Sequence, residues 1–480
     1  MESRGQGDGM MKKLISRNPV IWMIGVSAFI LFGCSSLRHE LFQSNAYDLG
    51  IFDQAIYLIS QGQSPISSFL GFHILGDHAA WIFYVLALFY KIHPSVYWLF
   101  AVQAASLALG ALPTWYLARY AGLTVQQSIA VAAVYLLYPL VYNINLFDFH
   151  PEVIAVPALL GAVLAARLDR IGWFCLTIVV ALGCKAVLSL TVAAMGVWLL
   201  VFEKKRRYGA IALISGIAWF AIATKIVIPL FGSQAASVER HIGRYAYLGN
   251  SFLEIAQNLL LKPGLVLGQV FSLDNLEYLL LLLAPVIWGL SLQGIQPLVG
   301  ALPTLGINLL SDFPTQKNLI HQYSLPAVPF LVLAVISTLA ARRGWLRSKR
   351  QIILWSLVAF MALAKYGYFW SIYVDSLDTW QATRQAVALV QTKRPVLTTA
   401  EIAPHLTHRP VVKLTSVYSP PHNLAEFDYI LLDVTHPGWQ SNREFASNLV
   451  NQLKNTQLFQ LRYQRDGVHL FVKKVFPNGV

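Results

Sequence analysis

Long apolar segments recur through most of this chain, and they constrain its fold more than any other feature. A helix needs roughly 20 apolar residues to cross about 30 Å of hydrocarbon. Backbone groups inside a bilayer must satisfy one another, so segments of this kind are expected to be helices. We predict about eleven spans: 19–37, 95–118, 125–143, 153–168, 171–187, 188–203, 209–231, 276–292, 296–311, 325–341 and 351–371.

The composition supports the same class of protein. Hydrophobic residues make up 56% of the 480 residues and charged residues only 12%, whereas soluble domains have about 25% charged residues. The net charge of +13 does not indicate nucleic-acid binding, because the basic residues form short runs between apolar segments, where they orient helices. We therefore expect a mainly α, polytopic transmembrane helix bundle that resides in a lipid bilayer.

Basic residues close alternate connections, which sets the predicted topology. The positive-inside bias makes these connections, and the N-terminus, cytoplasmic. The assignment is self-consistent only if residues 79–91 do not cross the bilayer, and this segment is short for a span. We predict an interfacial helix with aromatic anchors there. The basic residues used are Lys12, Lys13, Arg17, Arg119, Arg167, Arg170, Lys204, Lys205, Arg206, Arg207, Arg342, Arg343, Arg347, Lys349 and Arg350.

The composition changes after about residue 372 to that of a soluble domain. Short β-rich runs alternate with helical patterns, and residues 460–473 predict a hairpin that turns at Asp466-Gly467. We predict two domains, a transmembrane domain over 1–371 and a small α/β domain over 372–480 outside the cytoplasm. The soluble domain has no glycine-rich phosphate loop and no CxxC, so its sequence indicates no chemistry.

Unusual polar residues gather in four connections predicted on the outer face. These are the long first loop 38–94 and the segments 144–152, 232–275 and 312–324. Charged groups are costly inside hydrocarbon, so those at its edge are functional candidates. The candidates, with Lys185 at the end of a neighbouring span, are Asp48, Asp53, Asp77, His78, Asp148, His150, Glu152, Lys185, Arg244, Tyr245, His321 and Tyr323.

The residues alone leave two alternatives open for Asp48, the first of these candidates. Asp48 is either a functional carboxylate or the N-cap of a helix. Asp48 and Asp53 are five positions apart, about 140° around a helix, so one helix would not direct both at one ion. The whole set suits either a divalent cation that orients a phosphate or a relay of ions through a transporter.

Five motifs of the chain resemble one family of bacterial membrane proteins, called domain of unknown function 2079. The resemblance runs over nearly the whole chain, and that family is similar in plan to the GT-C glycosyltransferases. Their plan is a first span, a long outer loop with an acidic motif and two membrane-lying helices, further spans and a periplasmic domain. The motifs are residues 47–55, 76–78, 147–152, 244–249 and 321–324.

The resemblance implies a transferase that uses a polyprenyl-phosphate sugar in the bacterial inner membrane, with an unidentified acceptor. Asp48 matches the catalytic carboxylate, and Asp53, Asp77 and His78 would support it. A divalent cation, Mg²⁺ or Mn²⁺, is the expected cofactor. For this transferase we predict that Asp148, His150 and Glu152 support the reaction by holding the cation or by orienting the donor. The predicted donor-phosphate contacts are Lys185, Arg244, Tyr245, His321 and Tyr323.

Two alternatives remain beside the transferase. One is a transporter or flippase, although the acids gather at one face and no internal repeat is evident, unlike the pattern of transporters. The other is an inactive scaffold of the same fold. It is suggested by Leu49 and by Ala186-Val187, which stand where the resembled proteins have acidic residues.

The topology makes a direct prediction. A reporter that is active only outside the cytoplasm should be silent when fused after Gly344 and active when fused at Pro420, because the basic run near Gly344 is held inside. Activity of the two fusions in living cells is the measurement. The reverse result at either position would put the soluble domain on the wrong side and refute the eleven-span topology.

Overall fold

The computed structural model describes residues 19–232, 238–420 and 423–474. The basic residues Lys12, Lys13 and Arg17, used in the topology prediction, lie outside this range. The described chain forms two compact units. We call Met1–Cys34, His78–Ala80 and Ala101–Lys365 the membrane unit, and Ser35–Asp77, Trp81–Phe100 and Tyr366–Val480 the sheet unit.

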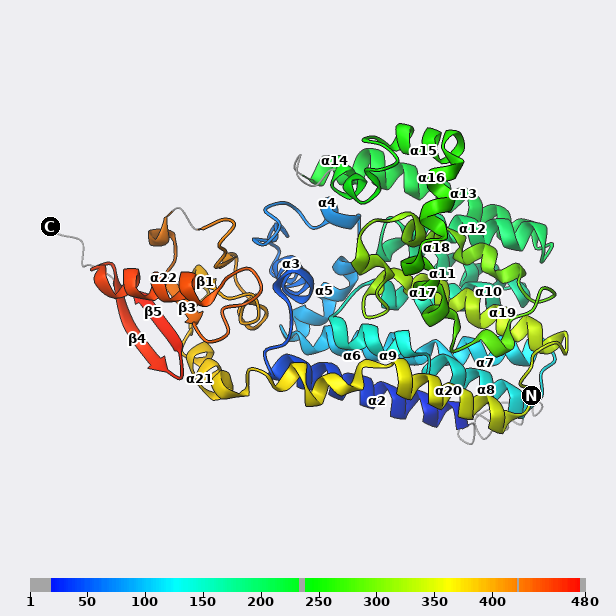
Figure 1. Ribbon diagram of the computed structural model, residues 1–480, viewed down its shortest axis with the longest axis horizontal. Coiled ribbons are helices and arrows are strands. Elements are labelled where there is room, and N and C mark those ends of the chain that lie inside the picture. Colours follow the sequence, from blue (N-terminus) through cyan, green and yellow to red (C-terminus); the bar gives the residue numbers. More distant parts are fainter. Residues whose placement is uncertain (1–18, 233–237, 421–422, 475–480) are drawn as a thin grey trace, which may run out of the picture. The chain divides into compact units, whose positions relative to one another are not determined.

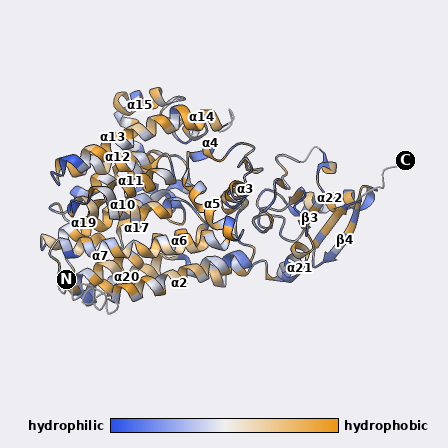
Figure 2. Cartoon of the chain, turned by 180° about the vertical axis from the view of Figure 1, so that it is seen from behind, coloured by the Kyte–Doolittle hydropathy of each residue, from blue (hydrophilic) through white to orange (hydrophobic). Residues whose placement is uncertain are grey.

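The membrane unit is helical, and its helices are hydrophobic along most of their length (Figures 1 and 2). Helices α2 and α6 pass from one unit into the other. The helices are α2 (Pro19–Glu40), α6 (Tyr97–Leu109), α7 (Ala111–Tyr120), α8 (Val125–Leu136), α9 (Pro139–Phe147), α10 (Glu152–Arg167), α11 (Ile171–Cys184), α12 (Leu188–Val201), α13 (Arg206–Ile222), α14 (Ile228–Phe231), α15 (Phe252–Leu261), α16 (Pro263–Val270), α17 (Leu273–Leu283), α18 (Leu302–Leu310), α19 (Val328–Ala340) and α20 (Lys349–Leu363).

Every predicted span contains helix, but the count of eleven is not confirmed. Five helical stretches in the described residues are long and apolar enough to cross a membrane, or up to seven if two bent pairs each form one span. Helices α11 and α12 have 14 residues each, and at 1.5 Å per residue such helices are about 21 Å long, less than the hydrocarbon thickness. One bent pair, α16 with α17, begins inside the loop predicted over 232–275.

Glycines allow α12 and α13 to pack closely. A Cβ atom on Gly196 would lie 2.4 Å from the backbone nitrogen of Leu213, and one on Gly216 would lie 2.5 Å from the carbonyl oxygen of Ser189. Helices in lipid have little hydrophobic drive to associate, so they rely on such close backbone approach. This pair therefore forms a rigid part of the membrane unit beside the break between α11 and α12.

The sheet unit contains the five-stranded sheet, in the order β2-β1-β3-β5-β4. Strands β1, β2 and β3 are parallel, and β5 runs antiparallel to β3 and β4. The hairpin turns at Asp466 and Gly467, which both have positive φ, so the predicted turn is confirmed. The strands are β1 (Val396–Thr398), β2 (Val412–Leu414), β3 (Tyr429–Asp433), β4 (Phe459–Arg465) and β5 (Val468–Lys473).

Two helices of this unit, α21 (Leu377–Ala388) and α22 (Arg443–Asn455), cover opposite faces of the sheet (Figure 1). Successive residues of a strand point to opposite faces. Accordingly, Val396 packs in the core under α21, and its neighbour Leu397 packs in the core under α22. The small α/β fold predicted for the C-terminal part is therefore confirmed.

The first outer loop belongs to the same compact unit. It contains the π-helix η1 (Ala46–Gly50), which continues into α3 (Ile51–Ser60), and the short helices α4 (Leu75–His78) and α5 (Ile82–Ile92). The side-chain nitrogen of Gln54 donates to the carbonyl oxygen of Arg409 at 3.1 Å, and the hydroxyl of Ser68 donates to the carbonyl oxygen of Val412 at 2.8 Å. The loop and the C-terminal residues thus form one folded body.

Candidate functional site

Asp48 lies in the sheet unit, in the first turn of the helical stretch that follows α2. The side chain of Asn45 caps this stretch by accepting a hydrogen bond from the backbone nitrogen of Tyr47 at 2.7 Å. The alternative that Asp48 is the N-cap is therefore wrong. Asp48 is half-buried, whereas the next residue, Leu49, is fully buried.

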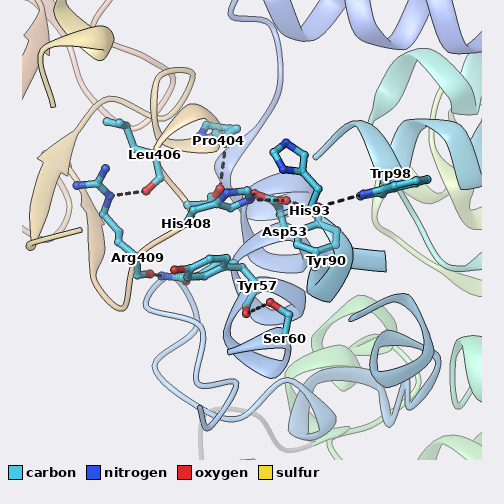
Figure 3. A network of polar contacts seen from close by, with 12 residues as sticks. Asp53, Tyr57, Ser60, Tyr90, His93, Trp98, Pro404, Leu406, His408 and Arg409 are labelled. Carbon is cyan, nitrogen blue, oxygen red and sulfur yellow. Dashed lines mark hydrogen bonds and ion pairs between the residues drawn. The ribbon is translucent and has the colours of Figure 1, made fainter. Parts of the chain in front are cut away.

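Asp53 lies one and a half turns further along and is almost completely buried, with 1% of its surface exposed. The hydroxyls of Tyr90 on α5 and Thr407 in the C-terminal part donate hydrogen bonds to its carboxylate. The imidazole nitrogen Nε2 of His408 lies 3.2 Å from the same carboxylate. Figure 3 shows Asp53 with Tyr90 and His408 from three distant parts of the chain. We call Asp53, Tyr90, Thr407 and His408 the Asp53 network.

The electrostatics of this network favour an ion pair. Burial, the largest influence, would raise the pKa of Asp53, but the charge and hydrogen bond of His408, with the two hydroxyl donors, hold it below its ordinary value. Burial would lower the pKa of His408, and the Asp53 carboxylate nevertheless raises it. Lys393 and Arg409 oppose that increase. A buried carboxylate that is paired and hydrogen-bonded in this way avoids the cost of an isolated charge.

The ring of Tyr57 stacks on the ring of His408, with centroids 4.8 Å apart. The ammonium of Lys393 donates to the Tyr57 hydroxyl at 2.5 Å and lies 5.0 Å from its ring centroid. These contacts fix the orientation of the imidazole. The Asp53 carboxylate is therefore enclosed by fixed side chains and does not face solvent.

In the membrane unit, the predicted cation ligand Glu152 and the predicted phosphate contact Lys185 form a buried ion pair. The Lys185 ammonium lies 2.7 Å from Oε1 of Glu152. The other carboxylate oxygen of Glu152 is buried and has no hydrogen-bond partner within the described ranges of the chain. Lys185 stands in the break between α11 and α12, and the backbone nitrogen of Ala186 donates to the carbonyl oxygen of His78 at 2.9 Å. Asp77, the neighbour of His78, is buried in the sheet unit.

A chain of ring contacts in the membrane unit brings together His150, His321, Tyr323 and Arg244. Phe147 joins the two histidines, with centroid distances of 5.5 Å to His150 and 4.1 Å to His321. His321 lies 6.3 Å from Tyr323. The guanidinium of Arg244 lies 5.5 Å from the Tyr323 centroid and 4.9 Å from that of Phe313. Such contacts hold a cation while leaving its N–H groups to other partners.

Tyr245, the neighbour of Arg244, donates its hydroxyl to the carbonyl oxygen of Ile307 at 3.2 Å. This hydrogen bond joins the segment to α18, and the predicted phosphate contact of Tyr245 stays a prediction. Asp148 is buried and ends α9 with φ of 151° and ψ of 176°. Only glycine adopts this region readily, and strain of this kind costs about 1–3 kcal/mol and clusters at functional sites.

The predicted metal ligands do not gather around one point. Nδ1 of His150 lies 3.3 Å from the backbone oxygen of Asp148, and Glu152 is paired with Lys185. In the described part of the chain, no group of three or more His, Cys, Asp or Glu side chains is placed to hold a metal ion. A divalent cation stays a prediction.

The sequence did not indicate Thr407 or His408. His408 is 355 positions from Asp53, and no local pattern distinguishes it from the other histidines. The polar run Thr407-His408-Arg409 between two strands was its only signal, and such runs are usually solvated turns.

The Asp53 network predicts a pH dependence of stability. His408 has a folded-state pKa above its ordinary 6.5, so its contribution is complete below 6.5 and is lost as the pH rises through the folded-state pKa. Asp53 has a folded-state pKa below its ordinary 3.8, so its contribution is lost only as the pH falls through that lower value. The thermal midpoint of the sheet unit should therefore fall as the pH rises above 6.5.

Thermal unfolding of the purified protein at a series of pH values is the measurement, with His408→Gln and His436→Gln as a matched pair. His436 pairs with a largely exposed carboxylate, that of Asp378, so its substitution should leave most of the pH dependence intact. The dependence should be much weaker in His408→Gln. An unchanged profile in that variant would contradict the ion pair.

Comparison with known proteins agrees with this architecture. The crystal structure of ArnT from Cupriavidus metallidurans bound to undecaprenyl phosphate has a TM-score of 0.56 and 12% identity, covering 94% of this chain and 97% of that chain. The apo structure of the same protein has a TM-score of 0.56 and 11% identity, covering 95% and 98%. ArnT is a GT-C glycosyltransferase, so the predicted similarity in plan to that class is confirmed at the level of fold.

No curated protein sequence matches this chain. A family model does match it, over residues 38–470, which include all the motifs named above. The chain belongs to the family of predicted membrane proteins DUF2079.

Proposed function

We propose that this membrane protein transfers a sugar from a polyprenyl-phosphate carrier to a hydroxyl-bearing acceptor on the extracytoplasmic side. The fold supports a glycosyltransferase, because the similar ArnT chain is covered almost completely. ArnT was crystallised with undecaprenyl phosphate, and we extend this class of lipid carrier to the present chain.

The observation that carries the proposal is the position of Asp48. It follows the first span directly, and Asn45 already caps the helical stretch, so capping does not explain a carboxylate there. Acidic groups at the edge of a membrane are costly and are functional candidates. Asp48 is half-buried, which suits a group that must meet both a substrate and water.

Asp48 acts as the general base in this proposal. It takes the proton of the acceptor hydroxyl, whose oxygen attacks the anomeric carbon of the sugar. The bond between that carbon and the phosphate oxygen breaks, and the phosphate leaves with the bonding electron pair, which inverts the anomeric configuration. A positioned base contributes about 10²–10⁴-fold in rate.

Arg244 is the preferred contact for the donor phosphate. A guanidinium can bind a phosphate through two parallel hydrogen bonds, and Phe313 and Tyr323 hold this one by their ring faces. The charge of Lys185 is already balanced by Glu152, so Lys185 would contribute less net attraction. Tyr323 contacts Arg244 directly, and His321 in turn contacts Tyr323.

Asp48 and Asp53 form a matched pair for a test of the base. Asn is nearly isosteric with Asp, so Asp48→Asn should abolish complementation of a deletion strain while protein abundance stays normal. Asp53→Asn should instead lower the free energy of unfolding by about 1–3 kcal/mol, because it weakens buried charge-assisted hydrogen bonds. Complementation, abundance by immunoblot and thermal unfolding are the measurements. Full complementation by Asp48→Asn would refute the proposed base.

The phosphate contact makes a separate prediction. Arg244→Ala should weaken binding of undecaprenyl phosphate, because loss of a charge-assisted contact costs about 1.5–3 kcal/mol, roughly ten- to a hundredfold in affinity. Arg244→Lys should recover only part of this, since an ammonium lacks the planar fork. Native mass spectrometry of the purified protein with undecaprenyl phosphate measures the effect.

The control is Arg343→Ala, which removes a positive charge from a connection predicted to be cytoplasmic. Its binding of undecaprenyl phosphate should equal that of the unchanged protein. Equal binding in Arg244→Ala would rule out the phosphate role. Ion-dependent uptake of a water-soluble solute into proteoliposomes would favour the transporter instead.

A further inference from the structure

The sheet unit contains a cavity of about 330 Å³ at the carboxyl ends of β1 and β3. Thr399 and Glu401 follow β1, and Asp433 ends β3; all three line the cavity. Strand β1 lies between its parallel neighbours β2 and β3, so the chain leaves β1 and β3 toward different sides. In open α/β sheets, ligands bind in the crevice outside the carboxyl ends of strands at such a point.

Two polar atoms at this cavity have no hydrogen-bond partner among the residues that the structure describes. Thr399 has only 1% of its surface exposed, and its hydroxyl has no hydrogen-bond partner. Oε2 of Glu401 is also buried and has no partner, although backbone N–H groups of Glu401 itself and Trp439 donate to the carboxylate. Buried polar groups in folded proteins are almost always hydrogen-bonded. These two acceptors therefore point to a ligand that donates hydrogen bonds.

Gly438 packs closely against the Glu401 carboxylate at the wall of the cavity. Its φ is +85°, and a Cβ atom there would lie 2.5 Å from Oε2 of Glu401. Any larger residue would be strained at this φ and would occupy the position beside the unpartnered oxygen. A side chain at position 438 would therefore displace the Glu401 carboxylate from its place at the cavity.

The charges around the cavity exclude an anionic ligand. Asp375, Glu401 and Asp433 line it. The basic side chain among the described lining residues, His436, is paired with Asp378 at 2.7 Å. Burial raises the pKa of Glu401, and the neighbouring Asp433 adds to that increase, so a cation here would relieve the unbalanced negative charge.

The kind of cation follows from the geometry. In the described residues, no group of three or more His, Cys, Asp or Glu side chains could hold a metal ion. An ammonium group has three donors and needs no such ligand cage. Apolar walls formed by Phe42, Ile372 and Trp380 would contact the carbon framework of the ligand, as in most small-molecule sites.

We propose that this cavity binds a ligand with a primary ammonium group, which donates hydrogen bonds to Glu401 and Thr399. The ammonium could be carried by an amino sugar or by an ethanolamine headgroup, and the two share the same recognition chemistry. The site is separate from the Asp53 network and does not depend on the proposed transferase activity.

Calorimetric titration of the purified full-length protein in detergent tests this site, with glucosamine, ethanolamine and N-acetylglucosamine as probes. We expect glucosamine or ethanolamine to bind and N-acetylglucosamine, which lacks the ammonium, to bind far more weakly. Tighter binding of glucosamine assigns the site to an amino sugar, and tighter binding of ethanolamine assigns it to a lipid headgroup. Equal binding of N-acetylglucosamine, or binding of neither amine, would overturn the proposal.

The matched variants are Glu401→Gln and Glu426→Gln, which each remove one negative charge from the sheet unit. Glu426 is exposed and does not line the cavity, so its substitution should leave binding unchanged. Glu401→Gln should weaken binding roughly ten- to a hundredfold with an unchanged thermal midpoint. Undiminished binding in Glu401→Gln would overturn the site. The comparison of glucosamine with N-acetylglucosamine uses the unchanged protein, so it does not depend on how this variant folds.

Discussion

The buried carboxylate of Asp53 is the constraint on which the sheet unit depends. It is removed from water, so it needs compensating donors, and these come from α5 and from the C-terminal residues Thr407 and His408. Moving any of these segments would leave a buried charge without its partners, which is strongly unfavourable. The first outer loop therefore has one position against the C-terminal part, and Asp48 is carried on the helical stretch that this network fixes.

Membrane and sheet units solve the same electrostatic problem differently. The Asp53 network combines an ion pair with neutral hydroxyl donors, which stabilises the carboxylate fully. Glu152 has one partner, Lys185, and leaves its second oxygen buried and unpaired. In a low dielectric, such a half-satisfied pair is the less stable arrangement.

Much of the fold was predictable from local pattern. Helices occur in every predicted span. The hairpin turns at Asp466-Gly467, as predicted, because these two residues adopt the positive φ that the turn needs. The number of spans was not predictable, because helices such as α11 and α12 are shorter than the apolar segments that contain them. The sequence also predicted which acidic, basic and histidine residues are candidates for the site. The partners of Asp53 were not, because their separation along the chain leaves no periodic signal.

The sheet unit is built from both ends of the chain, and this affects how the protein is made. Residues 35–77 are synthesised first, and their hydrogen-bond partners near residue 408 come after all the predicted spans. Contacts so distant in sequence form slowly, since a long loop must close before they contribute. Until then the carboxylate of Asp53 lacks Thr407 and His408. The helical stretch that carries Asp48 therefore reaches its final geometry only after the residues around position 408 have been synthesised.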